Sequence, residues 1–248
     1  MANGNDYAIQ VDHVTIRFNM ASEKVDNLKE YMIKLLKKEL IFQEFLAVKD
    51  VSLNIKRGEA WALIGINGSG KSTLLKAISG ILKPYKGKIT VNGEIAPLIE
   101  LGAGFDPNLT ARENIYLNGT GLGHSKKLMD EHFNEIVDFA ELWDFLDTPI
   151  KNFSSGMSAR LGFSIATMVK PDVLIVDEIL AVGDFLFRQK CMERMENMLS
   201  GGTTLLFVSH NIKDVRNLCD HAAWLDHGTL KMAGDVETVC DAYENLKQ

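Results

Sequence analysis

The chain has 248 residues and a formal net charge of −6, with 46% hydrophobic and 24% charged residues. This length predicts one large globular domain, or one domain with a small appendage, and the composition is ordinary for a soluble protein with a sizeable core. The negative charge argues against a protein that coats nucleic acid, because neutralising phosphates requires clustered Lys and Arg.

The sequence also lacks the marks of secretion, membrane spanning and disulfide bonding. Its first residues contain no basic stretch followed by an apolar core, so no signal peptide is expected. The apolar runs at residues 61–66 and 173–176 are far shorter than the roughly 20 residues that span a bilayer. Cys191, Cys219 and Cys240 form no Cys-x-x-Cys pair, which predicts buried free thiols in a reducing cytosol.

In chain order, strand and helix patterns alternate. Near-alternating apolar residues predict the first strand, and short unbroken apolar runs later in the chain are typical of strands buried on both faces. The predicted strands are residues 8–18, 48–55, 61–64, 173–176 and 204–208. Helices are expected to follow Lys71 and Ala111, and to cover residues 128–139, 158–168 and part of 235–248. This alternation predicts a single α/β domain over residues 1–248 with a parallel-rich core sheet.

Residues 19–46 depart from this rhythm and are predicted to be an insertion that carries an amphipathic helix. Apolar residues recur at helical spacing, while charged residues fill most of the remaining positions. The apolar set is Leu28, Tyr31, Met32, Leu35, Leu36 and Leu40. Two interpretations remain open. Either the helix packs these apolar side chains against the sheet, or it docks on a membrane partner or on lipid headgroups.

Residues 65–72 read Gly-Ile-Asn-Gly-Ser-Gly-Lys-Ser and satisfy the phosphate-loop pattern G-x-x-x-x-G-K-[ST]. They follow a predicted strand and open a predicted helix, so an incidental Gly-rich turn is disfavoured. The backbone N–H groups and the helix N-terminus would surround the β-phosphate of ATP. Lys71 is expected to reach the β- and γ-phosphates, and Ser72 to hold Mg²⁺. The predicted phosphate-binding residues are Gly65, Asn67, Gly68, Ser69, Gly70, Lys71, Ser72 and Thr73.

Two further strand ends carry candidate catalytic residues. The apolar run at 173–176 ends in Asp177 and Glu178, at the carboxyl edge where open α/β sheets bind ligands. Asp177 suits the Mg²⁺ shell, and Glu178 suits polarisation of the attacking water. His210 follows the run at 204–208 and is predicted to contact the γ-phosphate. The alternatives are a strand that simply exits into solvent and a structural histidine.

The segment Phe153-Ser-Ser-Gly-Met157 resembles the signature of ABC ATPases, usually Leu-Ser-Gly-Gly-Gln. The predicted signature residues are Ser154, Ser155, Gly156 and Met157; Met157 and Ser158 depart from the family pattern. The same string could be an ordinary helix N-cap. The resemblance covers residues 8–230 and implies the ABC ATPase fold of P-loop NTPases. That fold has a core sheet, an antiparallel β subdomain and a helical signature subdomain at about residues 110–168.

The resemblance also implies how the site is completed. In ABC ATPases the signature of one subunit caps the ATP held by the phosphate loop of the other, which implies a head-to-tail dimer of this chain. Asp184 matches the family's D-loop at the same interface. Phe18 matches the aromatic residue that stacks on adenine, although an ordinary sheet residue is the alternative. Glu100 stands where most members have Gln, in the loop that senses the γ-phosphate and touches the membrane subunit.

Within the family the chain looks most like the ATPases that export lipid-linked polysaccharides of the O-antigen, teichoic acid and rhamnan types. This likeness is carried by residues 99–105, 112–115, 154–157, 182–184 and 208–211 and by the insertion before residues 47–50. It implies a separate transmembrane permease and a place on the cytoplasmic face of the cell membrane. No C-terminal carbohydrate-binding domain is expected, so the membrane subunit or another protein would select the glycan. An ABC ATPase for another cargo, or a non-transport ABC ATPase of translation or DNA repair, remains an alternative.

Overall fold

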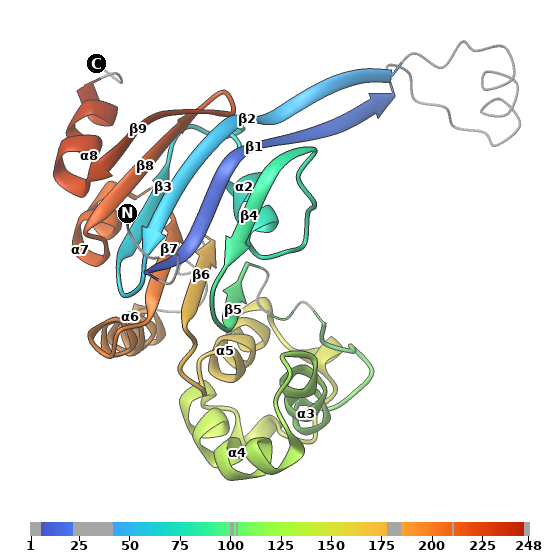
Figure 1. The fold of residues 1–248 in the computed structure, drawn as a ribbon. Helices are drawn as coiled ribbons and strands as arrows, with labels where there is room; N and C mark the ends of the chain where they lie inside the picture. The colour runs from blue at the N-terminus through green and yellow to red at the C-terminus, as the bar shows by residue number, and fades with distance from the viewer. Residues whose placement is uncertain are drawn as a thin grey trace, which may run out of the picture.

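The computed structural model describes residues 6–21, 42–99, 102, 104–177, 185–209 and 211–245 of the chain. Within these ranges the chain forms an antiparallel sheet, a mainly parallel sheet and a layer of helices (Figure 1). The prediction of an α/β domain with a parallel-rich sheet is therefore confirmed.

The antiparallel sheet has the strand order β2-β1-β4. Its strands are β1 (Tyr7–Ala21), β2 (Phe42–Lys56) and β4 (Lys86–Val91). β1 and β2 are longer than predicted and project from the body as a two-stranded ribbon (Figure 1). The predicted insertion of residues 19–46 therefore begins and ends inside strands. Its amphipathic helix lies outside the described residues.

The second sheet has the strand order β5-β6-β7-β3-β8-β9 and is parallel except for the β8–β9 pair. Its strands are β3 (Ala60–Ile64), β5 (Ile95–Leu98), β6 (Val173–Asp177), β7 (Thr204–Val208), β8 (His221–Asp226) and β9 (Thr229–Asp235). β3 and β7 are buried along their whole length. Their unbroken apolar sequences reflect this burial on both faces.

Helix α2 (Lys71–Ile78) packs with both sheets in one core. Leu74 and Leu75 of α2 are fully buried there with Val11 of the antiparallel sheet and Leu206 of the parallel sheet. The residues just before α2 are therefore held between the two sheets.

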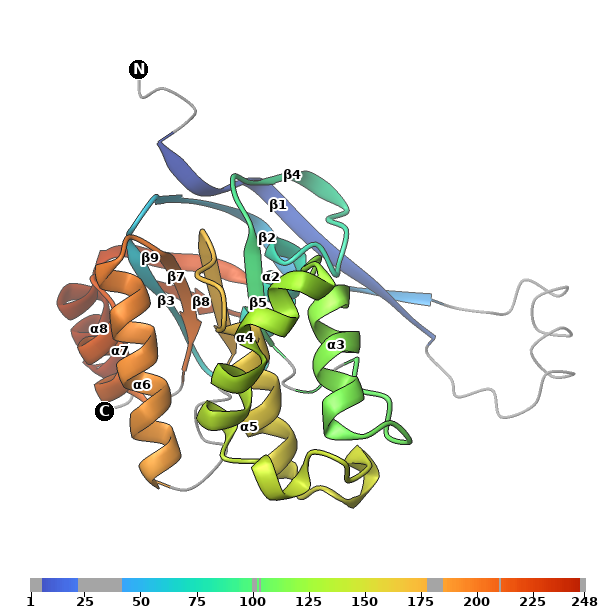
Figure 2. The ribbon, with the colours of Figure 1, turned by 90° about the horizontal axis from the view of Figure 1, so that it is seen from below.

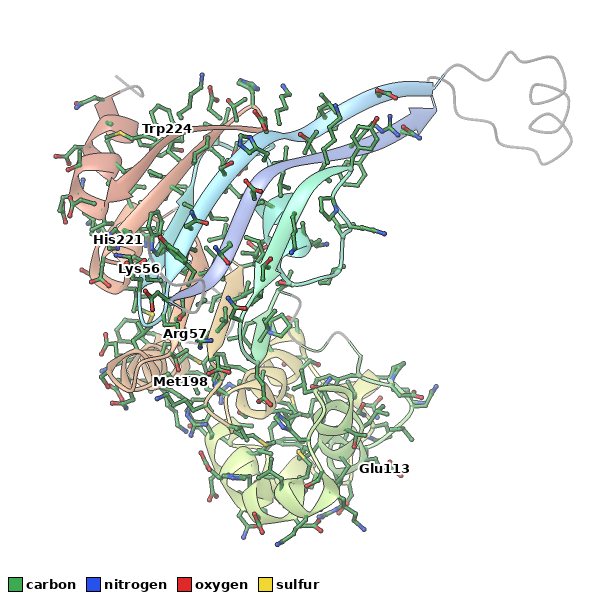
Figure 3. The ribbon with its side chains drawn as sticks, in the orientation of Figure 1. Lys56, Arg57, Glu113, Met198, His221 and Trp224 are labelled. Atoms are coloured by element: carbon green, nitrogen blue, oxygen red, sulfur yellow. The ribbon has the colours of Figure 1, made fainter. Side chains whose placement is uncertain are left out.

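A helical layer covers one end of the molecule (Figure 2), and in the view of Figure 1 it lies at the opposite end from the projecting ribbon. It contains α3 (Ala111–Gly121), α4 (Lys126–Ala140), α5 (Ser155–Ala166) and the short 3₁₀ helices η1 (Trp143–Phe145) and η2 (Ile150–Asn152). Its apolar side chains form a separate core cluster that includes Ile115, Ile136 and Leu161. Glu113, at the start of α3 (Figure 3), forms a capping box with Thr110, which fixes the beginning of the helix.

The remaining helices are α6 (Phe185–Ser200), α7 (Ile212–Leu218) and α8 (Val236–Asn245). They carry the three cysteines, or adjoin them, and all three are buried free thiols as predicted. Burial raises the pKa of the Cys191 thiol to about 12, so it is not a reactive nucleophile at neutral pH. Among the helices described, none combines the length and the apolar character that crossing a membrane requires.

Candidate nucleotide-binding site

The turn between β3 and α2 has a backbone path that only glycine can follow at two points. Gly65 and Gly70 have φ values of 147° and 105°. A Cβ atom on Gly65 would lie 2.2 Å from the carbonyl oxygen of Leu225, and one on Gly70 would lie 2.5 Å from that of Ala47. The glycines of the phosphate-loop pattern are thus required by backbone contacts with β8 and β2.

Lys71 is held inside this turn. Its Nζ donates hydrogen bonds to the carbonyl oxygens of Gly65 and Ile66, both at 2.9 Å, and the residue is 8% exposed. The ammonium therefore lies against the loop's own backbone, where a phosphate cradled by the loop would meet it. The predicted phosphate-binding set occupies the turn and the first turn of α2: Gly65, Asn67, Gly68, Ser69, Gly70, Lys71, Ser72 and Thr73.

The start of α2 fits an anionic ligand. The helix begins without a side-chain cap and without an acidic residue in its first turn, so its first N–H groups are satisfied by no side chain of the helix. Ser69 is 1% exposed, and its Oγ is one of two buried side-chain polar atoms without a hydrogen-bond partner in the described chain. Phosphate oxygens supply the acceptors that such donors need.

Asp177 lies at the same sheet edge as this turn. It pairs in register with Val208, which in turn pairs with Leu63 near the end of β3. Parallel strands end together, so the carboxylate and the phosphate loop leave β6 and β3, the two neighbours of β7, at the same edge of the sheet. Ser72 is exposed and Asp177 is partly buried, and their hydroxyl and carboxylate oxygens are suitable ligands for Mg²⁺. The described residues contain no cluster of three or more His, Cys, Asp or Glu side chains that could hold a metal by themselves.

Four predicted site residues lie outside the described residues: Glu178, His210, Glu100 and Asp184. The strands that lead to Glu178 and toward His210 end at Asp177 and Val208, which are paired neighbours. The roles assigned to these four side chains stay predictions.

The signature segment opens helix α5. Ser154 is the N-cap, and its side chain accepts a hydrogen bond from the N–H of Met157 at 3.2 Å. Ser155 is exposed, and Met157 packs against the core of the helical layer. The N-cap alternative therefore describes Ser154 correctly. The segment lies in a different layer from the phosphate loop of the same chain (Figure 2).

Phe18 lies on the projecting part of β1 and is 38% exposed. It pairs directly with Phe45 of β2, which is 47% exposed. Sequence reasoning missed Phe45, because the strand pairing cannot be read across the 20 residues, 22–41, that separate the two strands outside the described ranges. The only local signal was an aromatic residue just before the predicted second strand.

A charged cluster joins the helical layer to α6 and was also not predicted. Glu141 forms ion pairs with Arg160 of α5 at 2.8 Å and with Lys190 of α6 at 3.1 Å. Its hydrogen bond with Lys190, followed by the charges of Lys190 and Arg160, lowers the pKa of this carboxyl. Arg194 pairs with Glu135 of α4 at 2.9 Å. These contacts attach the layer that carries the signature to the layer that carries the sheet.

Comparison with known proteins shows the family to which this site belongs. A family model described as "ABC transporter" matches residues 48–181. The O-antigen export system ATP-binding protein RfbB of Klebsiella pneumoniae is 47% identical over 202 residues, which is 82% of each chain. The teichoic acids export ATP-binding protein TagH of Levilactobacillus brevis is 43% identical over 98% of this chain and 66% of its own length.

The solved structures that resemble this fold are ATP-binding cassettes. One is a dimeric post-hydrolysis state of the cassette MJ0796 bound to ADP and Pi, with a TM-score of 0.73, 22% identity, and coverage of 92% of this chain and 98% of that one. Another is an ATP-binding subunit of an ABC transporter, with a TM-score of 0.75, 23% identity, and coverage of 96% and 93%. At this identity the likeness concerns the fold.

Proposed function

The chain belongs to the ABC transporter family, and from that premise we propose that it is the ATP-hydrolysing subunit of an exporter of lipid-linked polysaccharide. The observation that supports the motor chemistry is the meeting of the Lys71 loop and Asp177 at one sheet edge. The cargo rests on the relatives, which are named for export of O-antigen and teichoic acids.

The chain's own residues divide the chemistry of hydrolysis among them. The phosphate loop and the start of α2 bind the β- and γ-phosphates of ATP. Ser72 and Asp177 hold Mg²⁺, which neutralises charge on the phosphate oxygens. Glu178 polarises the attacking water as general base, and His210 contacts the γ-phosphate. Phe18 stacks on adenine.

Two copies of the chain complete the site. The signature residues Ser154 to Met157 lie in the helical layer, so ATP held at Lys71 is capped by the signature of a second, head-to-tail copy. Asp184 lines the same interface. The start of α5 presents its N–H groups and the exposed Ser155, which suits an approaching phosphate.

The transport path is supplied by a separate membrane subunit, a proposal supported by relatives that are named as the ATP-binding proteins of export systems. The chain binds that permease at the cytoplasmic face of the membrane. The loop containing Glu100 transmits the conformational change of the ATPase dimer to the permease. Closure of the dimer on ATP and reopening after hydrolysis then drive the cargo through the permease.

Reconstitution of the chain with its permease in lipid vesicles tests this function. We expect a lipid-linked polysaccharide to stimulate ATP hydrolysis and to cross the bilayer only with hydrolysable ATP. If a different class of solute stimulates ATP hydrolysis and the glycolipid does not, the proposed cargo is wrong but the proposed ATPase activity stands. Absence of any ATP hydrolysis would reject both.

A further inference from the structure

The projecting ribbon presents two phenylalanines side by side. Phe18 and Phe45 are direct cross-strand partners, and both are substantially exposed, at 38% and 47%. Directly paired residues of antiparallel strands have Cβ atoms about 4.5–5.5 Å apart and project from the same face of the sheet. Two aromatic side chains in this position form a continuous apolar surface that remains substantially exposed.

The face that carries this pair points toward α2. Phe18 follows Ile16 by two residues on β1, so both project from the same face. Ile16 pairs with Val48, and both are buried in the core cluster that contains Leu74 of α2. Beyond Ile16 the pairing contains a bulge, and its unpaired residue, Ala47, belongs to β2. The side chains of β1 therefore keep alternating between the two faces of the sheet. Phe18 and Phe45 therefore extend the inner face past the edge of the core.

The same stretch of β2 touches the phosphate loop. A Cβ atom on Gly70 would lie 2.5 Å from the carbonyl oxygen of Ala47, which shows how closely the loop approaches the strand. Gly228 reinforces the contact, because its N–H donates to the carbonyl of Ser69 at 2.9 Å and its carbonyl accepts from the N–H of Lys49 at 2.7 Å. Phe45 is two residues from Ala47. The aromatic pair thus begins beside the start of α2.

We propose that Phe45 is a second base-stacking residue and forms, with Phe18, a two-ring platform for the purine of the bound nucleotide. This inference rests on the ATP site proposed above. A purine whose phosphates lie in the loop meets the inner face of the ribbon, where the rings of Phe18 and Phe45 supply π-faces and apolar area. The rings offer no hydrogen bonds to base edges, so Phe45 contributes affinity for a purine without selecting adenine over guanine.

Calorimetric titration of the full chain with MgATP, MgGTP and Mg²⁺-tripolyphosphate tests the proposal, because tripolyphosphate has no base. In the Phe45→Ala variant we expect ATP and GTP to bind at least about 5-fold more weakly, as alanine replacement of a stacking aromatic does. Tripolyphosphate binding should remain within about twofold of the wild type, because the phosphate loop is untouched. In steady-state kinetics KM for ATP should rise while kcat stays constant.

Two variants control for damage to the ribbon. Phe45→Tyr keeps the ring and should bind ATP like the wild type. Leu46→Ala truncates the neighbouring exposed residue, which projects from the opposite face as the partner of Arg17, and should also leave ATP binding unchanged.

Three results would overturn the proposal. They are an unchanged ATP affinity in Phe45→Ala, an equal loss of ATP and tripolyphosphate binding, or an equal loss of ATP binding in Leu46→Ala. Failure of the wild-type chain to bind either ATP or tripolyphosphate would overturn the proposed function itself, and the platform with it.

Discussion

The ammonium of Lys71 donates a hydrogen bond to the carbonyl oxygen of Gly65, six residues earlier, at 2.9 Å. The lysine is thereby closed back onto the first residue of its own loop. This places a buried cation at the start of α2, which suits the phosphate that we propose binds there.

Replacing Lys71 with Ala should weaken ATP binding by about 10- to 100-fold, because a charge-assisted hydrogen bond to phosphate is lost. Titration with MgATP measures this loss. Lys83→Ala, an exposed lysine beyond the end of α2, serves as the matched control and should bind ATP normally. If Lys71→Ala binds and hydrolyses ATP normally, Lys71 does not bind the phosphates of ATP.

The neighbouring serines of the signature should respond to mutation in different ways. Ser154→Ala removes the N-cap of α5 and should lower the free energy of unfolding by about 1 kcal/mol. Ser155→Phe alters an exposed position and should leave stability unchanged. It should abolish ATP hydrolysis and spare ATP binding by the monomer, because in the proposed head-to-tail dimer this side chain contacts the nucleotide of the other copy. Denaturant unfolding, ATP titration and ATPase assays separate these effects, and weakened monomer binding in Ser155→Phe would argue against action in trans.

The charged cluster at Glu141 predicts a pH-dependent contribution to stability. Its pKa is lowered in the folded state by Lys190 and Arg160, so the contribution is present above the unfolded-state pKa near 4.5 and is lost as pH falls through the lower folded-state value. The Glu141 side chain is 55% exposed, so Glu141→Gln should cost no more than about 1 kcal/mol at pH 7. Unfolding curves should show this difference shrinking in acid. A difference that grows as pH falls would mean that the ion pairs do not stabilise the fold.

Much of the site could be predicted from the sequence because it is encoded locally. The phosphate-loop glycines and Lys71 lie within one short stretch, residues 65–72, and Asp177 ends an apolar strand of the kind expected in a parallel sheet. Phe45 and the Glu141 cluster could not be predicted, because each depends on elements brought together only by folding. The extended ends of β1 and β2 were missed for a related reason. In these ends the described residues Asn19, Glu44, Phe45 and Leu46 are all exposed, so no alternation of buried apolar and exposed polar positions marks them.

Deletion of residues 27–40 separates the two interpretations of the predicted amphipathic helix. β1 ends at Ala21 and β2 begins at Phe42, so a short flexible linker in place of these residues leaves both strands intact. A docking helix predicts normal folding and basal ATP hydrolysis with loss of binding to the permease, measured by co-purification. An insoluble product would instead support packing of the helix on the domain.

In the proposed mechanism two copies of this chain close on ATP, and hydrolysis that depends on Glu178 reopens them. In Glu178→Gln the amide keeps the shape of the side chain but cannot take a proton from water. ATP hydrolysis should therefore fall by about 10²–10⁴-fold, as expected for a lost general base. ATP binding should persist, because the proposed contacts of Lys71, Ser72 and Asp177 do not involve Glu178.

Size-exclusion chromatography of Glu178→Gln with and without MgATP is the most direct test. We expect Glu178→Gln to elute as a dimer with ATP and as a monomer without it, while the wild type dimerises only transiently in ATP. If the variant stays monomeric in saturating ATP and hydrolyses it at the wild-type rate, then ATP does not close a dimer of this chain and Glu178 is not the general base.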